Sequence, residues 1–455
     1  MPQRDNMKVA VIGAGPVGLA AAAHLLERGL TPIVLEAGLA VGYSVRQWSH
    51  VRLFSPWQYN IDKASKRLLD SVGWNSPEPD YYPTGGELIA GYLDPLATRT
   101  VLREHVRTSS RVTGISRVGF DKVKTAGRSA APFEIHYRNG AGLKSVLAQA
   151  VVDASGTWNS PNPAGANGLL AIGEDAASPR IAYGMPDVLG RERTRYDGRT
   201  VAVLGTGHSA AGSLIDLSLL AKESSSTRVI WILRGNDAAK SFGGGANDKL
   251  AARGELGAEL SRVVNGGVVE VQSGFRVSHI NETAEGLRIG AGSACCGRHL
   301  IVDQLIVATG FRPDLGFLGE LRLSLDPALE CPPILAPLID PNVHSCGTVR
   351  PHGAHELAHP EPGLYVAGIK SYGRAPTFLM ATGYEQVRSI AANIAGDHEA
   401  ARRVELELPE TGVCSLNRSK PKDACCGDDA AISHADAVSC CTAAEQSKEA
   451  AGCRQ

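Results

Sequence analysis

The side chains with the strongest intrinsic chemistry in this chain of 455 residues are its ten cysteines, which are distributed very unevenly. None lies between residues 37 and 294, four lie between residues 295 and 346, and six occupy the last 42 positions. Six of the ten form adjacent pairs: Cys295-Cys296, Cys425-Cys426 and Cys440-Cys441. Adjacent Cα atoms are about 3.8 Å apart, less than the separation of about 4.4–6.8 Å in ordinary disulfides, so such pairs are poor structural staples.

Adjacent thiolates are instead good chelates for soft ions, and together with a third sulfur they suit trivalent arsenic. We therefore predict a metalloid or soft-metal site at Cys425, Cys426, Cys440 and Cys441. The tail that carries them, residues 406–455, is predicted to be flexible, because from residue 411 it has no aromatic and only four large apolar residues. That is too little apolar surface to offset the entropy of ordering. An incidental cysteine-rich tail is the alternative.

A glycine-rich turn near the N-terminus is the second candidate site. An apolar strand over residues 8–12 leads into Gly13, Gly15 and Gly18, then an apolar helix, then a strand that ends in Glu36. The first glycine permits the tight turn, the second lets the backbone approach a pyrophosphate, and the third lets helix and strand pack closely. The helix N-terminus donates N–H groups to the anion, and the glutamate can accept hydrogen bonds from a ribose. The pattern predicts a dinucleotide site; a glycine turn without a ligand is the alternative.

The same plan recurs in the middle of the chain. A strand leads into Gly205, Gly207 and Ala210, a helix follows, and the next strand ends near Arg234. A guanidinium suits the 2′-phosphate of a nucleotide, whereas a carboxylate would repel it. The second nucleotide is therefore predicted to be NADPH rather than NADH, with a solvated strand-end arginine as the alternative.

Two dinucleotide folds in one chain indicate FAD together with a nicotinamide cofactor. We expect an α/β protein with two Rossmann-like domains in a glutathione-reductase-like arrangement, the NADPH domain being inserted into a discontinuous FAD domain. The expected boundaries are 1–165 and 300–405 for the FAD domain, 166–299 for the NADPH domain and 406–455 for the tail. Three further strand-to-glycine segments, and a helix beginning near residue 377, should approach the cofactors. The additional cofactor-binding residues predicted on this basis are Gly156, Gly310, Gly368 and Thr377. Arg46 is predicted separately, as a cation that could neutralise flavin or nicotinamide phosphates.

At this point the chain resembles a known family. The two glycine motifs, the ATGF segment at 308–311 and the order of the pieces are similar to the flavin-containing (class B) monooxygenases. The segments KSYGRAPTFL and ATGYEQVRS, within 370–389, resemble the flavin monooxygenases of arsenic-resistance operons. The resemblance implies that FAD reduced by NADPH reacts with O₂ and that one oxygen atom passes to a soft nucleophile, S, N or As(III). It also implies catalytic positions at Trp48, near the isoalloxazine, and Ser55, near the face that reacts with O₂.

The alternatives to the monooxygenase interpretation stay open. Trp48, Phe54 and Trp57 could all be core aromatics, and for Phe54 we prefer that interpretation. Disulfide reductases of the same fold need a cysteine pair beside the flavin, and the gap between residues 37 and 294 counts against them. An FAD-dependent metal or metalloid reductase, and a metalloid-binding flavoprotein without turnover, remain the rival functions.

Composition and sequence pattern argue against nucleic-acid-binding, membrane-spanning and secreted proteins. Lys plus Arg is 46 and Asp plus Glu is 47, so the net charge of −1 gives no basic excess for nucleic acid. The most apolar segment, at residues 9–26, is interrupted by Gly, Pro and His, which argues against a membrane span. No signal-peptide pattern precedes the first strand. We expect a cytoplasmic enzyme whose partners are O₂, a small-molecule substrate and trivalent arsenicals.

Overall fold

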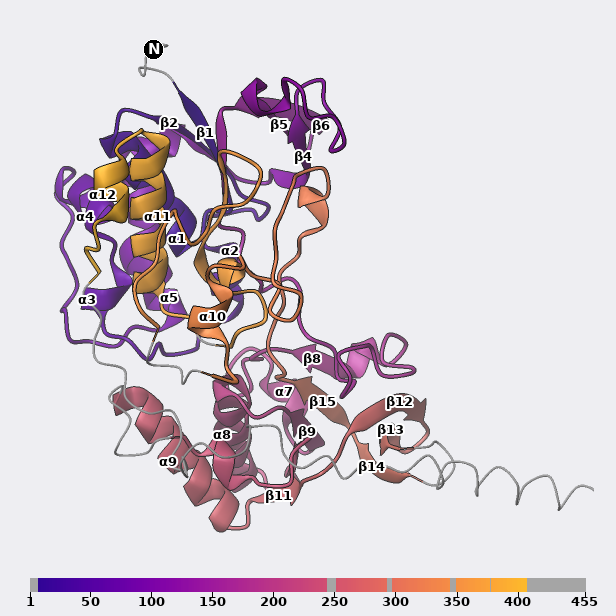
Figure 1. Cartoon of the computed structure of the whole chain (residues 1–455). Coiled ribbons are helices and arrows are strands. Elements are labelled where there is room, and N and C mark those ends of the chain that lie inside the picture. The colour runs from indigo at the N-terminus through magenta and orange to yellow at the C-terminus, as the bar shows by residue number, and fades with distance from the viewer. Residues whose placement is uncertain (1–6, 244–250, 293–296, 344–348, 377, 407–455) are drawn as a thin grey trace, which may run out of the picture. The chain divides into compact units, whose positions relative to one another are not determined.

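The computed structural model describes residues 7–243, 251–292, 297–343, 349–376 and 378–406, all within one compact unit, Met1–Asn417. Its strands are β1 Lys8–Ile12, β2 Thr31–Leu35, β3 Val106–Arg107, β4 Arg111–Arg117, β5 Phe133–Asn139, β6 Gly142–Ala148, β7 Ala150–Asp153, β8 Ile181–Tyr183, β9 Thr200–Leu204, β10 Arg228–Ile232, β11 Val269–Gln272, β12 Val277–Thr283, β13 Gly286–Ala291, β14 Arg298–Val302, β15 Gln304–Val307 and β16 Leu364–Val366. Its helices are α1 Pro16–Glu27, α2 Tyr43–Gln47, α3 Trp57–Asn60, α4 Lys63–Asp70, α5 Gly85–Leu88, α6 Asp94–Arg99, α7 Arg193–Tyr196, α8 His208–Glu223, α9 Ala251–Asn265, α10 Ala336–Ile339, α11 Met380–Ile394 and α12 His398–Arg402. Figure 1 shows their arrangement.

The first sheet has the order β16-β7-β1-β2-β3, and its strands are parallel. Residues 9–12 of β1 are all buried, as expected for the central strand of a sheet covered on both faces. Helix α1 joins β1 to β2 as the crossover, and Gly29, with a φ of +71°, follows its end. Helix α1 packs against α11, beside which it lies in Figure 1.

The second sheet repeats this plan, with the order β11-β10-β9-β15-β8 and parallel strands. Strand β9, helix α8 and strand β10 correspond to β1, α1 and β2. A three-stranded antiparallel sheet precedes β7 in the first half, formed by β4, β5 and β6, and another precedes β15 in the second half, formed by β12, β13 and β14. The two halves are therefore structural repeats, and the predicted α/β fold with two Rossmann-like domains is confirmed.

The repeat corrects one expected boundary. We expected the chain to return to the first domain at residue 300, so that the strand leading to Gly310 would belong to the FAD domain. Strand β15, Gln304–Val307, instead pairs with β9 and β8 in the second sheet. It is the counterpart of β7, since each strand follows its own antiparallel sheet and ends at a glycine turn. The chain leaves the second sheet only after residue 307.

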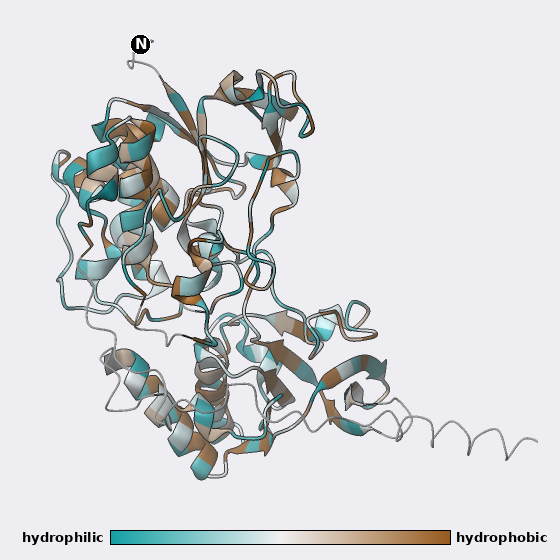
Figure 2. Cartoon of the chain, in the orientation of Figure 1, coloured by the Kyte–Doolittle hydropathy of each residue, from teal (hydrophilic) through white to brown (hydrophobic). Residues whose placement is uncertain are grey.

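Apolar residues concentrate where the elements pack. In Figure 2 brown is most frequent in the strands of the two parallel sheets, whereas the strands of the small antiparallel sheets and helices such as α9 and α12 carry both teal and brown residues. The largest buried cluster gathers around α1, α11 and one face of the first sheet, and separate clusters lie on the two faces of the second sheet. Among the described residues, no helix is long and apolar enough to span a membrane. The cytoplasmic location stays a prediction.

Candidate functional site

A cavity of about 1380 Å³ is lined by residues from both halves of the chain. From the first half come the turns that hold Gly13, Gly15 and Gly156, and from the second half comes the N-terminal part of α8, including His208 and Ser209. Phe54 packs edge-to-face on His208 with ring centroids 5.1 Å apart, so the two halves touch along the cavity. One cavity thus joins the end of the first glycine turn to the start of α8.

The glycines of the first turn have the steric roles predicted for them. At Gly13, where φ is +97°, a Cβ atom would lie 2.8 Å from the carbonyl oxygen of Ala154. At Gly18 a Cβ would lie 2.0 Å from the carbonyl oxygen of Gly13, so helix α1 could not pack on the turn. At Gly15 a Cβ would meet no atom within 4 Å, and this residue lines the cavity as the N-cap of α1. The backbone therefore forms an open cradle at a helix N-terminus, which fits the pyrophosphate of a dinucleotide.

Glu36 also lies where the sequence places it. Its carboxylate accepts hydrogen bonds from the backbone N–H groups of Ala14, at 2.7 Å, and Gly38, at 2.8 Å. These bonds fix the side chain against the turn, and Glu36 lines the cavity. A carboxylate has about four lone-pair sites, so capacity remains for the hydroxyl groups of a ribose.

Two further glycines complete the flavin side of the cavity. Gly156 and Gly368 both have a φ of +71° and both line the cavity. The N–H of Gly368 donates to Oε1 of the buried Gln386, at 2.8 Å, and the amide nitrogen of Gln386 lies 2.9 Å from Nε2 of His352. Helix α11 therefore holds this turn through a chain of buried hydrogen bonds.

The second glycine motif has the same geometry as the first. A Cβ at Gly205 would lie 2.3 Å from the carbonyl oxygen of Ala308, whereas a Cβ at Gly207, the N-cap of α8, would meet no atom within 4 Å. Ala210 is fully buried in the helix behind them. Arg234 is exposed after β10, where its Nη1 donates to the carbonyl oxygen of Ala166, at 3.3 Å. None of these four residues lines the cavity itself, so their nucleotide contacts stay predictions.

Both residues expected at the catalytic position line the cavity. The ring of Trp48 is held beside Gly85, where a Cβ would lie 2.8 Å from a ring carbon. The hydroxyl of Ser55 donates to Oδ1 of Asn60, at 2.7 Å, so its proton is already engaged within the protein. Phe54 lines the cavity rather than the core, and our preferred interpretation of it was wrong.

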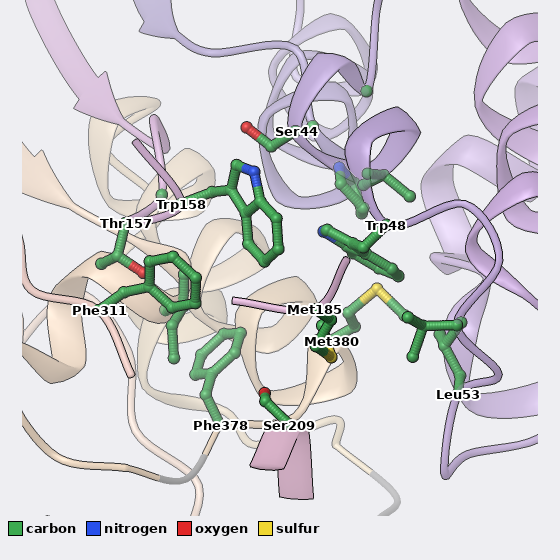
Figure 3. Close-up of a pocket in the computed structure, with 18 of the residues that line it drawn as sticks. Ser44, Trp48, Leu53, Thr157, Trp158, Met185, Ser209, Phe311, Phe378 and Met380 are labelled. Carbon is green, nitrogen blue, oxygen red and sulfur yellow. The ribbon is translucent and has the colours of Figure 1, made fainter. Parts of the chain in front are cut away.

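The cavity has an aromatic wall of which the sequence analysis predicted only Trp48. We define the aromatic wall as seven residues of the lining, and Figure 3 shows them around the centre of the cavity: Trp48, Leu53, Trp158, Met185, Phe311, Phe378 and Met380. Trp158 and Phe311 stack, with ring centroids 4.7 Å apart and 28° between the ring planes. Both follow glycine turns that the sequence analysis identified, so an aromatic residue one or two positions after such a glycine was the available signal.

Several predicted contacts lie elsewhere. Arg46 forms an ion pair with Asp94 and donates to the carbonyl oxygen of Val41, so it faces away from the cavity, whose lining excludes it. Gly310, with a φ of +88°, is also absent from the lining, and its carbonyl accepts from the N–H of Asn162. Helix α11 begins at Met380 rather than near residue 377. The remaining predicted site residues lie outside the described part of the chain: Thr377, Cys425, Cys426, Cys440 and Cys441.

Titratable groups of the cavity include one unusual carboxyl. Burial raises the pKa of Asp216, on α8, to about 6, and the nearby carboxylate of Asp187 adds to the rise. Burial also lowers the pKa of His50 on the opposite half. The described residues of the lining include no cysteine. Cys331, the one cysteine that the structure describes, is buried apart from the cavity, and burial raises the pKa of its thiol to about 12.

Comparisons with known proteins agree with this geometry. The chain is 26% identical over 237 residues to the flavin-containing monooxygenase FMO GS-OX-like 2 of Arabidopsis thaliana, covering 47% of this chain and 48% of the relative. It is 30% identical over 236 residues to the monooxygenase cfoE of Aspergillus candidus, covering 49% of this chain and 35% of the relative. The chain thus matches about half or less of the length of these curated relatives.

Solved structures show the same fold at lower identity. Bacillithiol disulfide reductase Bdr of Bacillus cereus matches with a TM-score of 0.62 and 20% identity, covering 86% of this chain and 99% of that one. The cadaverine monooxygenase DfoA of Erwinia amylovora, solved with FAD, matches with a TM-score of 0.60 and 15% identity, covering 90% and 99%.

The family profile described as pyridine nucleotide-disulphide oxidoreductase matches residues 10–331. This match spans both glycine motifs and both parallel sheets up to β15. It confirms the expected oxidoreductase class and, with the cradle geometry, the expected cofactors FAD and NADPH. The chain belongs to the pyridine nucleotide-disulphide oxidoreductase family.

Proposed function

We propose that the protein is an FAD- and NADPH-dependent monooxygenase. In the balanced reaction, NADPH, a proton, O₂ and a soft nucleophile give NADP⁺, water and the nucleophile with one added oxygen atom. Bound FAD would supply the chemistry, because it accepts a hydride and reduces O₂. The observation that carries the proposal is the single cavity that joins the Gly13–Gly15 cradle to the start of α8, with no cysteine among its described lining residues.

The chain's own residues then have separate tasks. The N-terminal ends of α1 and α8 bind the two pyrophosphates, and Glu36 orients the ribose of the first nucleotide. The turns at Gly156 and Gly368 let the backbone approach the flavin side. Trp48 and the rest of the aromatic wall would exclude water from the reacting atoms, which limits competing reactions with solvent.

The test compares electron acceptors. Purified holoprotein should oxidise NADPH only when O₂ is present, and a thioether acceptor should gain one atom from isotopically labelled dioxygen. Equal NADPH oxidation without O₂, in the presence of a metal or metalloid acceptor, would favour the reductase instead. No NADPH oxidation with any acceptor, despite bound FAD, would favour the binding-protein alternative.

A narrower part of the proposal is a role in arsenic resistance. It is supported by the adjacent pairs Cys425-Cys426 and Cys440-Cys441 and by the resemblance of residues 370–389 to monooxygenases of arsenic-resistance operons. The tail would collect trivalent arsenicals in the cytoplasm for the cavity. A chain ending at residue 410 should retain FAD and NADPH oxidation but bind arsenite more weakly than the full chain. Replacing the four cysteines by serine in the full chain is the matched variant, and unchanged arsenite binding in both would overturn this role.

A further inference from the structure

We propose that Asn162 and Arg312 are positioning residues for the reduction of FAD by NADPH. They hold together the two segments in which the chain crosses between its halves, and so fix the angle at which the second half faces the first. The inference rests on the part of the proposed function in which NADPH donates a hydride to FAD. It does not depend on what the reduced flavin then oxidises.

The chain crosses between its two halves twice. The first connection, residues 154–162, follows β7 and leads into the second half. The second connection, residues 308–314, follows β15 and leads back. The two connections pair as a short antiparallel ribbon in which Pro161 lies opposite Phe311. This connecting ribbon couples two crossings that could otherwise twist independently.

Asn162 is bonded to the second connection through all of its polar groups. Its N–H donates to the carbonyl oxygen of Gly310, at 2.9 Å, and its carbonyl oxygen accepts from the hydroxyl of Thr309, at 3.1 Å. Its Nδ2 donates to the carbonyl oxygen of Thr309, at 3.0 Å, and its Oδ1 accepts from Nε of Arg312, at 2.9 Å. The N–H of Arg312 in turn donates to the carbonyl oxygen of Ser160, at 2.9 Å. These hydrogen bonds close the connecting ribbon at one point.

The sequence stiffens both connections where they pair. Asn162 lies between Pro161 and Pro163, and Arg312 precedes Pro313. Proline fixes its own φ and restricts the residue before it to extended backbone. Little conformational entropy is therefore lost when the connecting ribbon forms.

An aromatic stack joins the connecting ribbon to both halves. Trp158 of the first connection and Phe311 of the second stack with ring centroids 4.7 Å apart, side by side in Figure 3. The indole N–H of Trp158 donates to Oε1 of Gln47, on α2 of the first half, at 3.0 Å. Gly184 follows β8 in the second half, and a Cβ there would lie 3.1 Å from the ring of Trp158 and 3.2 Å from that of Phe311. A change in the angle between the halves would therefore break these contacts.

The angle matters because, under the proposed function, each half binds one nucleotide. Hydride transfer needs the reacting atoms about 3–3.5 Å apart, and an error of about 1 Å can lower the rate about 100-fold. The described residues that line the cavity do not include Asn162, Thr309 or Arg312. These residues therefore act through the geometry of the two halves rather than by contact with a nucleotide.

The experiment follows the reduction of FAD when holoprotein is mixed with NADPH in the absence of O₂. Asn162→Ala loses the side-chain bonds to Thr309 and Arg312. We expect the rate constant at saturating NADPH to fall at least about 10-fold, while the dissociation constants of NADPH and FAD change by less than about 2-fold. Asn139→Ala is the matched control, because that side chain accepts from the N–H of Ala141 within one half. A merely structural role would lower the free energy of unfolding without slowing reduction in the folded holoprotein.

Hydrogen exchange in the same holoproteins measures the connecting ribbon itself. The amides of Asn162 and Arg312 should be protected in the parent protein, and the amide of Arg312 should exchange at least about 10-fold faster in Asn162→Ala. Fast exchange of both amides in the parent protein, or faster exchange in the variant without slower reduction, would overturn the inference.

Two further outcomes separate the positioning role from other roles. A large loss of NADPH affinity in Asn162→Ala would show that this residue binds the nucleotide, and the positioning role would be wrong. Normal reduction of the parent protein by NADPH, with no transfer of oxygen to any acceptor in air, would overturn the proposed function and leave this inference standing.

Discussion

The Nζ atom of Lys370 lies 2.7 Å from Oδ2 of Asp153, and both side chains are completely buried. Asp153 ends β7, and its Oδ1 accepts from the hydroxyl of Ser155, at 2.6 Å. Lys370 also donates to that hydroxyl, at 3.1 Å. The ion pair therefore links the turn that holds Gly156 to the turn that holds Gly368, and both turns line the cavity.

Removing one partner of this pair should destabilise the protein strongly. In Lys370→Met the carboxylate of Asp153 would stay buried without its cation, a situation that costs about 3–5 kcal/mol in other proteins. The double variant Lys370→Met with Asp153→Leu should recover most of that loss, because neither buried charge remains. Urea unfolding followed by tryptophan fluorescence measures the free energy of unfolding. A loss below about 1 kcal/mol in the single variant would contradict the account.

Gly13→Ala and Gly15→Ala form a matched pair that separates folding from cofactor binding. At Gly13 the methyl group would meet backbone at 2.8 Å with φ at +97°, so the variant should lose about 1–3 kcal/mol of stability. At Gly15 the φ is −78° and the methyl group would meet no protein atom. Apoprotein stability should change little there, while FAD affinity falls at least about 10-fold because the methyl group fills the cradle. Calorimetry of the apoprotein measures the change in stability, and titration with FAD measures the change in affinity. Unchanged FAD affinity in Gly15→Ala would show that the pyrophosphate does not bind at this turn.

The glycine roles could be predicted from sequence because their causes are local. Each follows from a tight turn between a strand and the next helix, and the spacing itself carries that information. The contact of Arg46 with Asp94 could not be predicted, since 48 residues separate the two and nothing in the sequence says which side chains meet. The strand ending at Val307 was assigned to the wrong sheet for the same reason. Buried apolar strands have similar sequences, and only the pairing of strands in the structure shows which sheet each one joins.

The chain of hydrogen bonds behind Gly368 gives stability a dependence on pH. Because Oε1 of Gln386 accepts from Gly368, its amide N–H₂ group faces Nε2 of His352, at 2.9 Å. That nitrogen must then accept, and Nδ1–H donates to the carbonyl oxygen of Arg350, at 3.0 Å. A proton on Nε2 would break the chain, and burial independently lowers the pKa of His352.

The sign follows from the proton balance between the two states. Below about pH 6.5 the unfolded chain protonates this histidine while the folded protein does not, so the free energy of unfolding falls as the pH falls. The slope from one such group reaches about 1.4 kcal/mol per pH unit and ends below the folded pKa. Replacing His352 by leucine should remove this part of the slope and leave the parts from His50 and His359, whose pKa values burial also lowers. Unfolding curves between pH 5 and 8 measure how the free energy of unfolding depends on pH. An identical slope in the variant would show that His352 titrates with the same pKa in the folded and unfolded states.

Arg234 should decide which nicotinamide nucleotide is used. The N–H of Gly205 donates to the carbonyl oxygen of Ile232, just as the N–H of Gly13 donates to the carbonyl oxygen of Leu35. The residue after Ile232 is therefore the counterpart of Glu36, and Arg234 lies one residue beyond it. Among the described residues it has no carboxylate partner, and its one hydrogen bond is the long contact to Ala166. An exposed guanidinium so placed can turn toward a 2′-phosphate, and charge-assisted bonds of about 1.5–3 kcal/mol correspond to about 10–100-fold in affinity.

In Arg234→Ser the KM for NADPH should therefore rise within that range while the KM for NADH stays the same. Arg228→Ser is the matched control, because Arg228 is an exposed arginine at the opposite end of the same strand, paired with Glu270. Steady-state kinetics with both nucleotides measure the preference. If Arg234→Ser kept the NADPH preference of the parent protein, another cation would have to bind the 2′-phosphate, and the second glycine motif would no longer predict the nucleotide.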